Sequence, residues 1–352
     1  MSIFRLSLLP ISLLYAAVLR VRHALYDCGI LHSTKIGIPS ICIGNLELGG
    51  TGKTPLTEYI AKLLMDKRNV AIVSGGYKRK SKEAIIAGKD TTLDELGDEA
   101  MQYHSKFGEN IKVAVGKNRA MVIDKLMNQG SIPETIIFDD AFQHRKIKAG
   151  LSILTTNYLA PFYNNHLIPA GTLRDIKSRA CSADIIIVSK TPESATNKDK
   201  NRIRQKLSQY GNQNVYFASL AYGQPVACNI AAQNTSLDAK ANVICLCGIA
   251  QPEYFILYLE SKYHVTKKLV FSDHHTFSEN DINRIKSEGK TIVTTEKDAM
   301  RLTYNPYFSE LKNTPIYYIP IEVRFNADEA SQLDKEIMTY VTKNQQSGSF
   351  YQ

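Results

Sequence analysis

Residues 41–55 read Ile41-Cys42-Ile43-Gly44-Asn45-Leu46-Glu47-Leu48-Gly49-Gly50-Thr51-Gly52-Lys53-Thr54-Pro55. They begin with an apolar, β-rich run, and a segment with helical periodicity starts at Pro55. A strand, a glycine-rich loop ending in Gly-Lys-Thr and a helix, in this order, are typical of a P-loop, whose backbone N–H groups and helix N-terminus surround phosphate oxygens. We therefore predict that the chain binds ATP through the loop residues Gly49, Gly50, Thr51, Gly52, Lys53 and Thr54.

Two side chains of this loop have specific expected roles. Lys53 should bridge the β- and γ-phosphates, and Thr54 should bind Mg²⁺ through its hydroxyl group. Glu47 occupies the position at which the usual spacing has a glycine, so we expect the pair Gly49-Gly50 to supply the flexibility instead. A glycine-rich turn without function is the alternative, but it does not explain why strand, glycines, Gly-Lys-Thr and helix coincide.

A second motif places two carboxylates after an apolar run. Asp139 and Asp140 follow residues 136–138, Ile-Ile-Phe. At the carboxyl end of a parallel strand, such side chains face the nucleotide crevice and can hold Mg²⁺ or its water ligands, so we interpret the pair as a Walker B motif. A capping or turn role is the alternative. The nearest match to a guanine-reading Asn-Lys-x-Asp motif, residues 189–192, lacks the aspartate, which favours ATP over GTP.

Short β-rich runs alternate with longer helical segments along most of the chain. This pattern predicts an α/β fold with a mostly parallel P-loop NTPase-type sheet, flanking helices and a second, smaller α/β domain. Strands are expected first at residues 39–43, 70–74, 112–115, 135–139, 151–154 and 185–189, and again at 243–247, 269–271 and 291–294. Helices are expected at residues 55–66, 98–106, 118–128, 198–210, 252–262 and 279–288.

The boundaries follow from where this alternation stops and resumes. We expect an amphipathic helix within residues 1–30, a nucleotide-binding domain at 31–221, a connection at 222–241, the smaller domain at 242–343 and a tail at 344–352. The connection is rich in small and polar residues, which is typical of an inter-domain segment.

The N-terminal segment, residues 4–26, carries leucine, valine and alanine at helical spacing. Its uncharged part, residues 6–19, is shorter than the roughly 20 residues of a membrane-spanning helix and contains Pro10. We expect a helix lying in the plane of an anionic membrane surface, with flanking arginines reaching lipid phosphates. The alternatives are a helix packed on its own protein and a signal peptide.

Composition limits the class of protein. The 352 residues suffice for two domains, and 44% hydrophobic with 22% charged residues excludes a disordered chain and a multi-span membrane protein. The net charge of +9 favours anionic partners such as nucleotides, phospholipid headgroups, phosphorylated sugars or nucleic acid. Six scattered cysteines without a Cys-x-x-Cys pair indicate reduced thiols and a reducing compartment.

Seven motifs in order resemble the tetraacyldisaccharide 4'-kinase family of lipid A biosynthesis. Besides the P-loop they are Gly97-Asp98-Glu99, Asp139-Asp140-x-Phe142-Gln143-His144, Pro169-Ala170-Gly171-x-Leu173-Arg174, Gly248-Ile249-Ala250-x-Pro252, Asp273-His274-His275-x-Phe277 and Thr295-Glu296-Lys297-Asp298-Ala299. The resemblance implies phosphorylation of the 4'-hydroxyl of a lipid disaccharide 1-phosphate with ATP and Mg²⁺. It also implies a peripheral protein on the cytoplasmic face of the bacterial inner membrane, with no nucleic acid and no obligate protein partner.

The resemblance also implies roles for individual residues. Asp98 would accept the hydroxyl proton with His274 orienting it, although Asp98 as a helix N-cap and His274 as a core or metal-binding histidine are alternatives. Lys53 and Arg174 would neutralise phosphate charge. The implied Mg²⁺ ligands are Thr54, Asp139, Asp140 and Asp175, and the implied substrate-binding residues are Asn45, Glu99, Gln143 and His144. Asp175 departs from the family, whose members mostly carry glutamate there.

Two other functions share part of this pattern. A membrane-associated P-loop NTPase switch would hydrolyse ATP in response to a protein partner and label no lipid. A soluble small-molecule kinase would use the N-terminal helix only as core. The basic clusters at residues 78–82 and 145–148 either face anionic lipid or are solvated surface.

Overall fold

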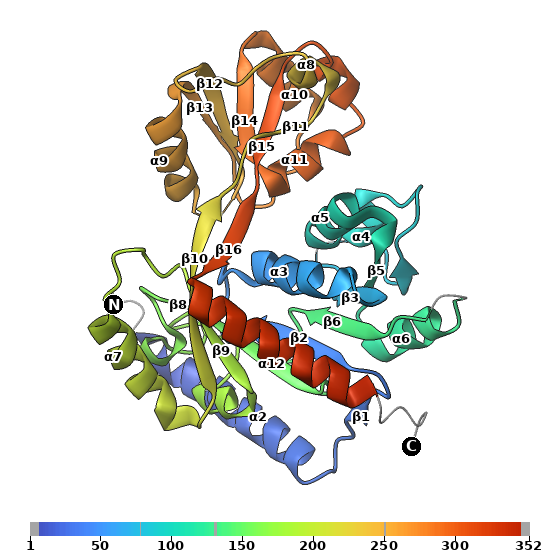
Figure 1. Cartoon of the computed structure of the whole chain (residues 1–352), viewed down its shortest axis with the longest axis vertical. Coiled ribbons are helices and arrows are strands. Elements are labelled where there is room, and N and C mark those ends of the chain that lie inside the picture. Colours follow the sequence, from blue (N-terminus) through green and yellow to red (C-terminus); the bar gives the residue numbers. More distant parts are fainter. Residues whose placement is uncertain (1–6, 78, 130–131, 250, 346–352) are drawn as a thin grey trace.

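A computed structural model of the chain describes residues 7–77, 79–129, 132–249 and 251–345. Two units of different size stand one above the other, connected by a pair of long strands (Figure 1). The larger unit contains a nine-stranded sheet and the smaller a five-stranded sheet. The expected α/β fold with two parallel-rich sheets is therefore confirmed.

The nine-stranded sheet has the order β16-β10-β9-β8-β2-β6-β3-β5-β4. Its inner strands are parallel, and only β16 and β4, at the two edges, run antiparallel to their neighbours. Inner strands such as β9 are buried along their whole length, as expected for a sheet covered on both faces. The strands are β2 (Ser40–Asn45), β3 (Val70–Ser74), β4 (Ile85–Ile86), β5 (Ile111–Val115), β6 (Thr135–Asp139), β8 (Leu151–Asn157), β9 (Ile185–Ser189), β10 (Asn214–Tyr222) and β16 (Ile321–Phe325).

Helices cover both faces of this sheet and bury their apolar sides there. One core contains Leu56 and Ile60 of α3, Met101 of α5 and Leu333 of α12. The opposite core contains side chains of α6 and α7, among them Leu126. These helices are α3 (Lys53–Met65), α4 (Leu93–Leu96), α5 (Asp98–Phe107), α6 (Arg119–Met127), α7 (Asn197–Leu207) and α12 (Ala327–Gln345). A short parallel pair, β1 (Thr34–Lys35) with β7 (Ile147–Lys148), lies outside the main sheet.

The smaller unit has the strand order β11-β15-β14-β12-β13, parallel except for β11. Phe255 and Leu259 of α9 pack on one side, and Ile282 of α10 with Leu302 of α11 belong to the other core. Its elements are β11 (Val226–Ala227), α8 (Ile230–Gln233), β12 (Asn242–Cys247), α9 (Pro252–Lys262), β13 (His264–Val270), α10 (Glu279–Ser287), β14 (Thr291–Thr295), α11 (Glu296–Thr303) and β15 (Ile316–Ile319).

The end of the chain returns to the larger unit. Strand β16 pairs with β10, and Leu333, Ile337 and Val341 of α12 are fully buried in a core of the nine-stranded sheet. Residues 321–343, expected in the smaller domain, therefore pack with the larger unit. The expected connection contains β11 and α8, and α12 includes residues 344 and 345 of the expected tail. Residues 346–352 lie outside the described part of the chain.

The N-terminal helix α2 (Leu9–Asp27) lies along the larger unit. Its inner face packs Ala16 and Leu19 against Ile176, while Leu14 and Val18 are 70% and 58% exposed. The inner face thus packs on the protein itself, which was the alternative prediction. The outer face is apolar and exposed. Among the described residues, no helix combines the length and apolar character needed to cross a bilayer. The expected first residues of this helix, 4–6, are not described.

Candidate active site

The P-loop connects the end of β2 to the start of α3. Gly49 and Gly52 have left-handed φ angles of 105° and 77°, a conformation that glycine adopts without strain. It is this pair, and not Gly49-Gly50, that turns the loop. Among the described residues, no main-chain acceptor binds the amide groups of residues 49–52, so these N–H groups remain available to an anion. Glu47 is buried and accepts a hydrogen bond from Asn165. Its side chain thus makes a contact that a glycine at this position could not make.

Asp139 is the last residue of the neighbouring strand β6 and Asp140 follows it, as predicted. Asp139 is buried, and this burial together with the charges of Glu99 and Asp140 raises its pKa to about 7. Its Oδ1 accepts a hydrogen bond from Thr57 at 3.4 Å, whereas its Oδ2 has no partner in the described structure. A buried carboxylate oxygen without a donor fits a Mg²⁺ ion or one of its water ligands.

Asp140 lies between two cations. Arg174 donates to both of its oxygens, with Nη1 2.9 Å from Oδ2, and Lys53 Nζ lies 3.7 Å from Oδ1. Burial alone would raise the pKa of Asp140, but the Arg174 hydrogen bonds and the Lys53 charge lower it to about 2. Arg174 also donates to the Asn45 side chain. The fold thus brings Asn45, Lys53, Asp140 and Arg174 together from separate parts of the sequence.

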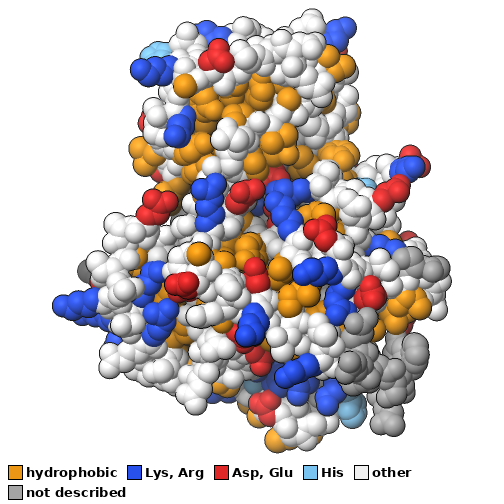
Figure 2. All heavy atoms as spheres, in the orientation of Figure 1, with side chains coloured by type: hydrophobic (Ala, Val, Ile, Leu, Met, Phe, Trp, Pro, Cys, Tyr) orange, Lys and Arg blue, Asp and Glu red, His pale blue; other side chains and the backbone are white. Residues whose placement is uncertain are grey.

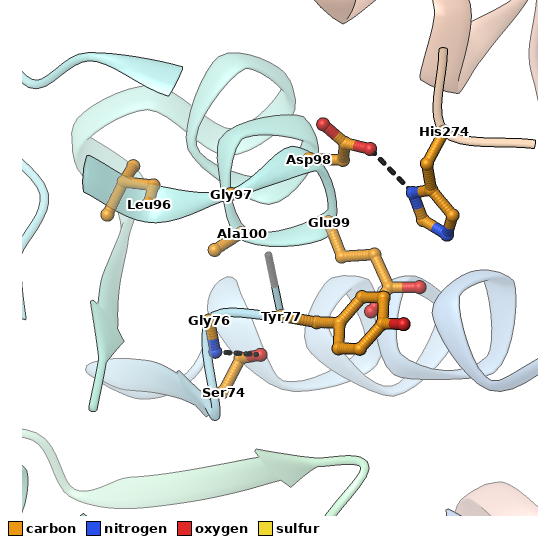
Figure 3. Close-up of a pocket in the computed structure, with 9 residues that line it drawn as sticks. All are labelled: Ser74, Gly76, Tyr77, Leu96, Gly97, Asp98, Glu99, Ala100 and His274. Carbon is orange, nitrogen blue, oxygen red and sulfur yellow. Dashed lines mark hydrogen bonds and ion pairs between the residues drawn. The ribbon is translucent and has the colours of Figure 1, made fainter. Parts of the chain in front are cut away.

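Asp98 and His274 meet across the junction of the two units. Asp98 begins α5, and its Oδ2 lies 2.9 Å from Nδ1 of His274, which follows β13 in the smaller unit (Figure 3). Gly97 is the N-cap of α5, so the N-cap alternative for Asp98 does not hold. His275 instead pairs with Asp281 and stacks on Phe271, which is a structural role.

The pocket beside this pair is lined by residues of both units. Tyr77, Gly97, Asp98, Glu99 and His274 surround it, and Tyr77 meets the His274 ring edge-on (Figure 3). The carboxylate of Glu99 accepts a hydrogen bond from Lys297 at 2.8 Å. The Lys297 charge, followed by the Lys53 charge, lowers the pKa of Glu99 against the effect of burial. Glu99, the residue after Asp98, is therefore close enough to Lys53 to be affected by its charge.

Gln143 and His144 follow the acidic pair on the same loop. Gln143 Nε2 donates to the Asn45 backbone carbonyl at 2.6 Å, which places two expected substrate-binding residues side by side. Burial, with the neighbouring Arg119 charge, lowers the pKa of His144 to about 4. His144 is therefore a neutral imidazole near neutral pH.

Asp175 has partners outside the acidic pair. It is fully buried, and its Oδ1 lies 2.7 Å from Nε2 of His23 on α2 and also accepts from the Ile176 amide. The backbone turns the side chains of Arg174 and Asp175 to different partners, Asp140 and His23. Asp175 thus secures the N-terminal helix through one oxygen, while its Oδ2 has no partner among the described residues. The part of the chain described contains no group of three or more His, Cys, Asp or Glu side chains placed to hold a metal ion.

Sequence reasoning missed three cations of this region. Arg119 is buried behind the acidic pair and donates to the backbone carbonyls of Asp139 and Asp140 at 3.4 and 3.2 Å. Lys297 and Arg301 belong to α11 and reach α5 of the other unit. Lys297 lies inside the motif at residues 295–299, but nothing in the sequence identified its partner. Arg301 comes shortly after that motif, and no pattern in the sequence identified it as a functional residue.

A P-loop, an acidic pair at the end of the adjacent strand and a carboxylate–imidazole pair at the junction of the two units are the parts expected of a P-loop phosphotransferase. Residues 4–339 match the family model of tetraacyldisaccharide-1-P 4'-kinase. A tetraacyldisaccharide 4'-kinase of Bacteroides thetaiotaomicron is 40% identical, with 97% of this chain and 95% of the relative covered. One of Flavobacterium psychrophilum is also 40% identical, over 99% and 100% of the two chains.

The structural comparison agrees. The crystal structure of LpxK from Aquifex aeolicus in complex with ATP matches with a TM-score of 0.74 and 26% identity, covering 96% of this chain and 100% of that one. This chain belongs to the tetraacyldisaccharide 4'-kinase family. It is a kinase that transfers phosphate from ATP, with Mg²⁺, to an alcohol group of a lipid A precursor. The NTPase-switch alternative is not favoured.

Proposed function

We propose that the chain phosphorylates the 4'-hydroxyl of a tetraacyldisaccharide 1-phosphate in the cleft between its two units, while held on the cytoplasmic face of the inner membrane. The observation that carries the proposal is the Asp98–His274 pair, 2.9 Å apart, at a pocket that is also lined by Glu99, whose pKa the Lys53 charge helps to lower. A hydroxyl group placed there would have a proton acceptor on one side and the phosphate loop on the other.

On the donor side, the chain supplies amides and cations. The N–H groups of residues 49–52 bind the phosphates, and Lys53 and Arg174 neutralise charge on the group being transferred. Both cations contact Asp140 in this structure, so the carboxylate holds them near the loop. Thr54, Asp139 and Asp140 are the residues that would hold Mg²⁺. When bound, Mg²⁺ supplies further neutralisation of phosphate charge.

On the acceptor side, the chain positions a hydroxyl group and removes its proton. Asp98 accepts the proton late in the transfer, and His274 orients the carboxylate and shares the proton. Asn45, Glu99, Gln143 and His144 are proposed to bind the sugar and its phosphate. Asn45 and Gln143 are already hydrogen-bonded to each other, and Glu99 lines the pocket.

The membrane contact is assigned to the outer face of α2. Ile11, Leu13, Leu14, Val18 and Val21 of this helix are each more than half exposed. An acylated substrate leaves a bilayer at a cost of about 0.8 kcal/mol per methylene group, so an enzyme that docks at the headgroup level avoids this cost. The inner face of α2 is held by Arg145, which donates to the His23 carbonyl at 2.9 Å and to Asp27 at 2.6 Å. Arg145 therefore binds this helix instead of lipid.

The test is transfer of label to a defined lipid. The chain is incubated with γ-labelled ATP, Mg²⁺ and tetraacyldisaccharide 1-phosphate in mixed detergent micelles, and the product is analysed for a new phosphate at the 4' position. Labelled bisphosphate is expected from the native chain and none from Lys53→Ala. ATP hydrolysis that labels no lipid would contradict the proposal.

A further inference from the structure

Asp98 has a second partner besides His274. Arg301 of α11 places Nε 2.9 Å and Nη2 2.7 Å from the same Asp98 Oδ2 that His274 Nδ1 approaches to 2.9 Å. The Arg301 side chain is only 4% exposed. A guanidinium has donors only and stays charged at every pH at which proteins fold. One carboxylate oxygen is therefore fixed by a permanent cation and an imidazole.

Arg301 is itself held firmly from behind. Its Nη1 donates to Asp298 Oδ1 at 2.8 Å and to the Gly248 carbonyl at 2.9 Å. Asp298 is fully buried and also accepts from Thr295 and from the Gly248 amide. The same Gly248 carbonyl accepts from the His274 amide at 3.2 Å. The guanidinium thus joins Asp98, the His274 segment and the core of the smaller unit.

We propose that Arg301 is a positioning residue for the kinase reaction. It holds the Asp98 carboxylate next to His274 and docks the smaller unit on α5. The inference rests on the proposed roles of Asp98 and His274. Figure 2 shows acidic and basic side chains next to one another along the junction of the two units, and α11 lies above α5 in Figure 1. Docking of the two units therefore places the Arg301 guanidinium next to the Asp98–His274 pair.

The charges around the pair define how a variant should behave. Burial alone would raise the pKa of Asp98, but hydrogen bonds from His274 and Arg301 and the Arg301 charge lower it to about 2. The other charged groups nearby are Lys297 with Glu99, Asp298 behind Arg301, and Asp273, 3.9 Å from His274 Nε2. Loss of Arg301 removes two donors and a charge, so the pKa of Asp98 should rise.

The experiment compares Arg301→Gln, Arg301→Lys and the control Arg284→Gln, an exposed arginine on α10. Measured are kcat and KM for ATP in the micelle assay from pH 4 to 9, Tm, and the nitrogen chemical shifts of the His274 ring during a pH titration. In Arg301→Gln we expect kcat to fall about 10- to 100-fold with KM for ATP unchanged, an acidic limb that moves from below pH 4 into the measured range, and altered His274 shifts. Arg301→Lys keeps the charge with fewer donors. Its kcat should therefore lie between those of the native chain and Arg301→Gln, and the acidic limb of its pH profile should stay at the native position.

Several results would overturn the proposal. A native kcat and native pH profile in Arg301→Gln would remove Arg301 from the mechanism. An equal loss in both variants, with a lower Tm and an unmoved acidic limb, would assign Arg301 to folding. If Arg301→Gln does not fold, a native kcat in Arg301→Lys would overturn the positioning role instead. If the native chain labels no lipid, the proposed reaction fails, and unchanged His274 ring shifts in Arg301→Gln would separately overturn the positioning role.

Discussion

The arrangement of the phosphate site depends on a few charged side chains. Lys53 and Arg174 are both drawn to Asp140, whose pKa of about 2 keeps it anionic under all working conditions. Lys53 is the only one of these cations on the loop itself. Its position depends on a short segment of sequence, whereas the position of Arg174 depends on a loop more than a hundred residues away.

Replacing Lys53 with Ala should lower kcat at least about 1,000-fold, because charge on the transferred phosphate loses its cation. The measurement is label transfer to the lipid, with circular dichroism to verify the fold. Lys62→Ala, an exposed lysine further along α3, is the matched control. Activity near the native level in Lys53→Ala would discredit the phosphate-loop interpretation.

Asp98→Ala and His274→Ala should each lose several orders of magnitude in kcat and still bind ATP, since neither side chain lies on the loop. Single-turnover transfer and equilibrium nucleotide binding check the two parts of this prediction. His264→Ala, at an exposed histidine, serves as control. Turnover close to native in either variant would exclude that residue from the proton transfer.

At the scale of one element, helix α2 has two faces with different tasks. The inner face reaches the site through His23 and through Tyr15, which donates to the Arg174 carbonyl at 3.2 Å. The outer face carries Leu14 and Val18 without any packing partner that buries them. The sequence pattern indicated the apolar stripe but not the division of the helix between protein and surroundings.

The double variant Leu14→Ser, Val18→Ser should lose much of its association with anionic vesicles, because it removes apolar area from the outer face. Its Tm and its activity in detergent micelles should remain native. Co-sedimentation with vesicles of phosphatidylglycerol and phosphatidylethanolamine measures the effect, with Lys198→Ser on α7 as control. Unchanged sedimentation would show that this face does not hold the chain at a membrane.

Helix α12 is the element whose place the sequence did not indicate. Leu333 is fully buried in the core of the nine-stranded sheet, so Leu333→Ala should lower the free energy of unfolding by about 2–5 kcal/mol. Urea unfolding measures the change, and Gln332→Ala, at the exposed neighbouring position, should differ little from native. Equal stability of the two variants would argue against the burial of α12 in this core.

At the scale of the whole molecule, ion pairs join the two units. Helix α11 places Lys297 on Glu99, Arg301 on Asp98 and Glu296 on Lys106, whose Nζ also lies 2.5 Å from Glu58. These contacts stand beside the covalent connections through β10 and β16 (Figure 1). The relative position of the units therefore depends partly on charge.

This junction should respond to acid with a defined sign. The folded pKa of Asp98, about 2, lies below its ordinary value of 3.8, so its contribution to stability is present above pH 3.8 and is lost as the pH falls toward 2. Thermal unfolding between pH 5 and 2 should show a steeper loss of Tm for the native chain than for Asp98→Asn. Asp90→Asn, at an exposed position, should follow the native curve; identical slopes for all three would contradict the prediction.

The sequence by itself determined the P-loop, the acidic pair, most strands of both sheets and the family, because these depend on local glycines, apolar periodicity and ordered motifs. Only the tertiary structure decided that β16 and α12 return to the larger unit, that Asp175 binds His23, and that Arg301 reaches Asp98. Such contacts join residues up to 300 positions apart, as between Tyr340 of α12 and Ser40. Their partners are chosen by packing of whole helices and sheets, and no local pattern in the chain encodes that choice.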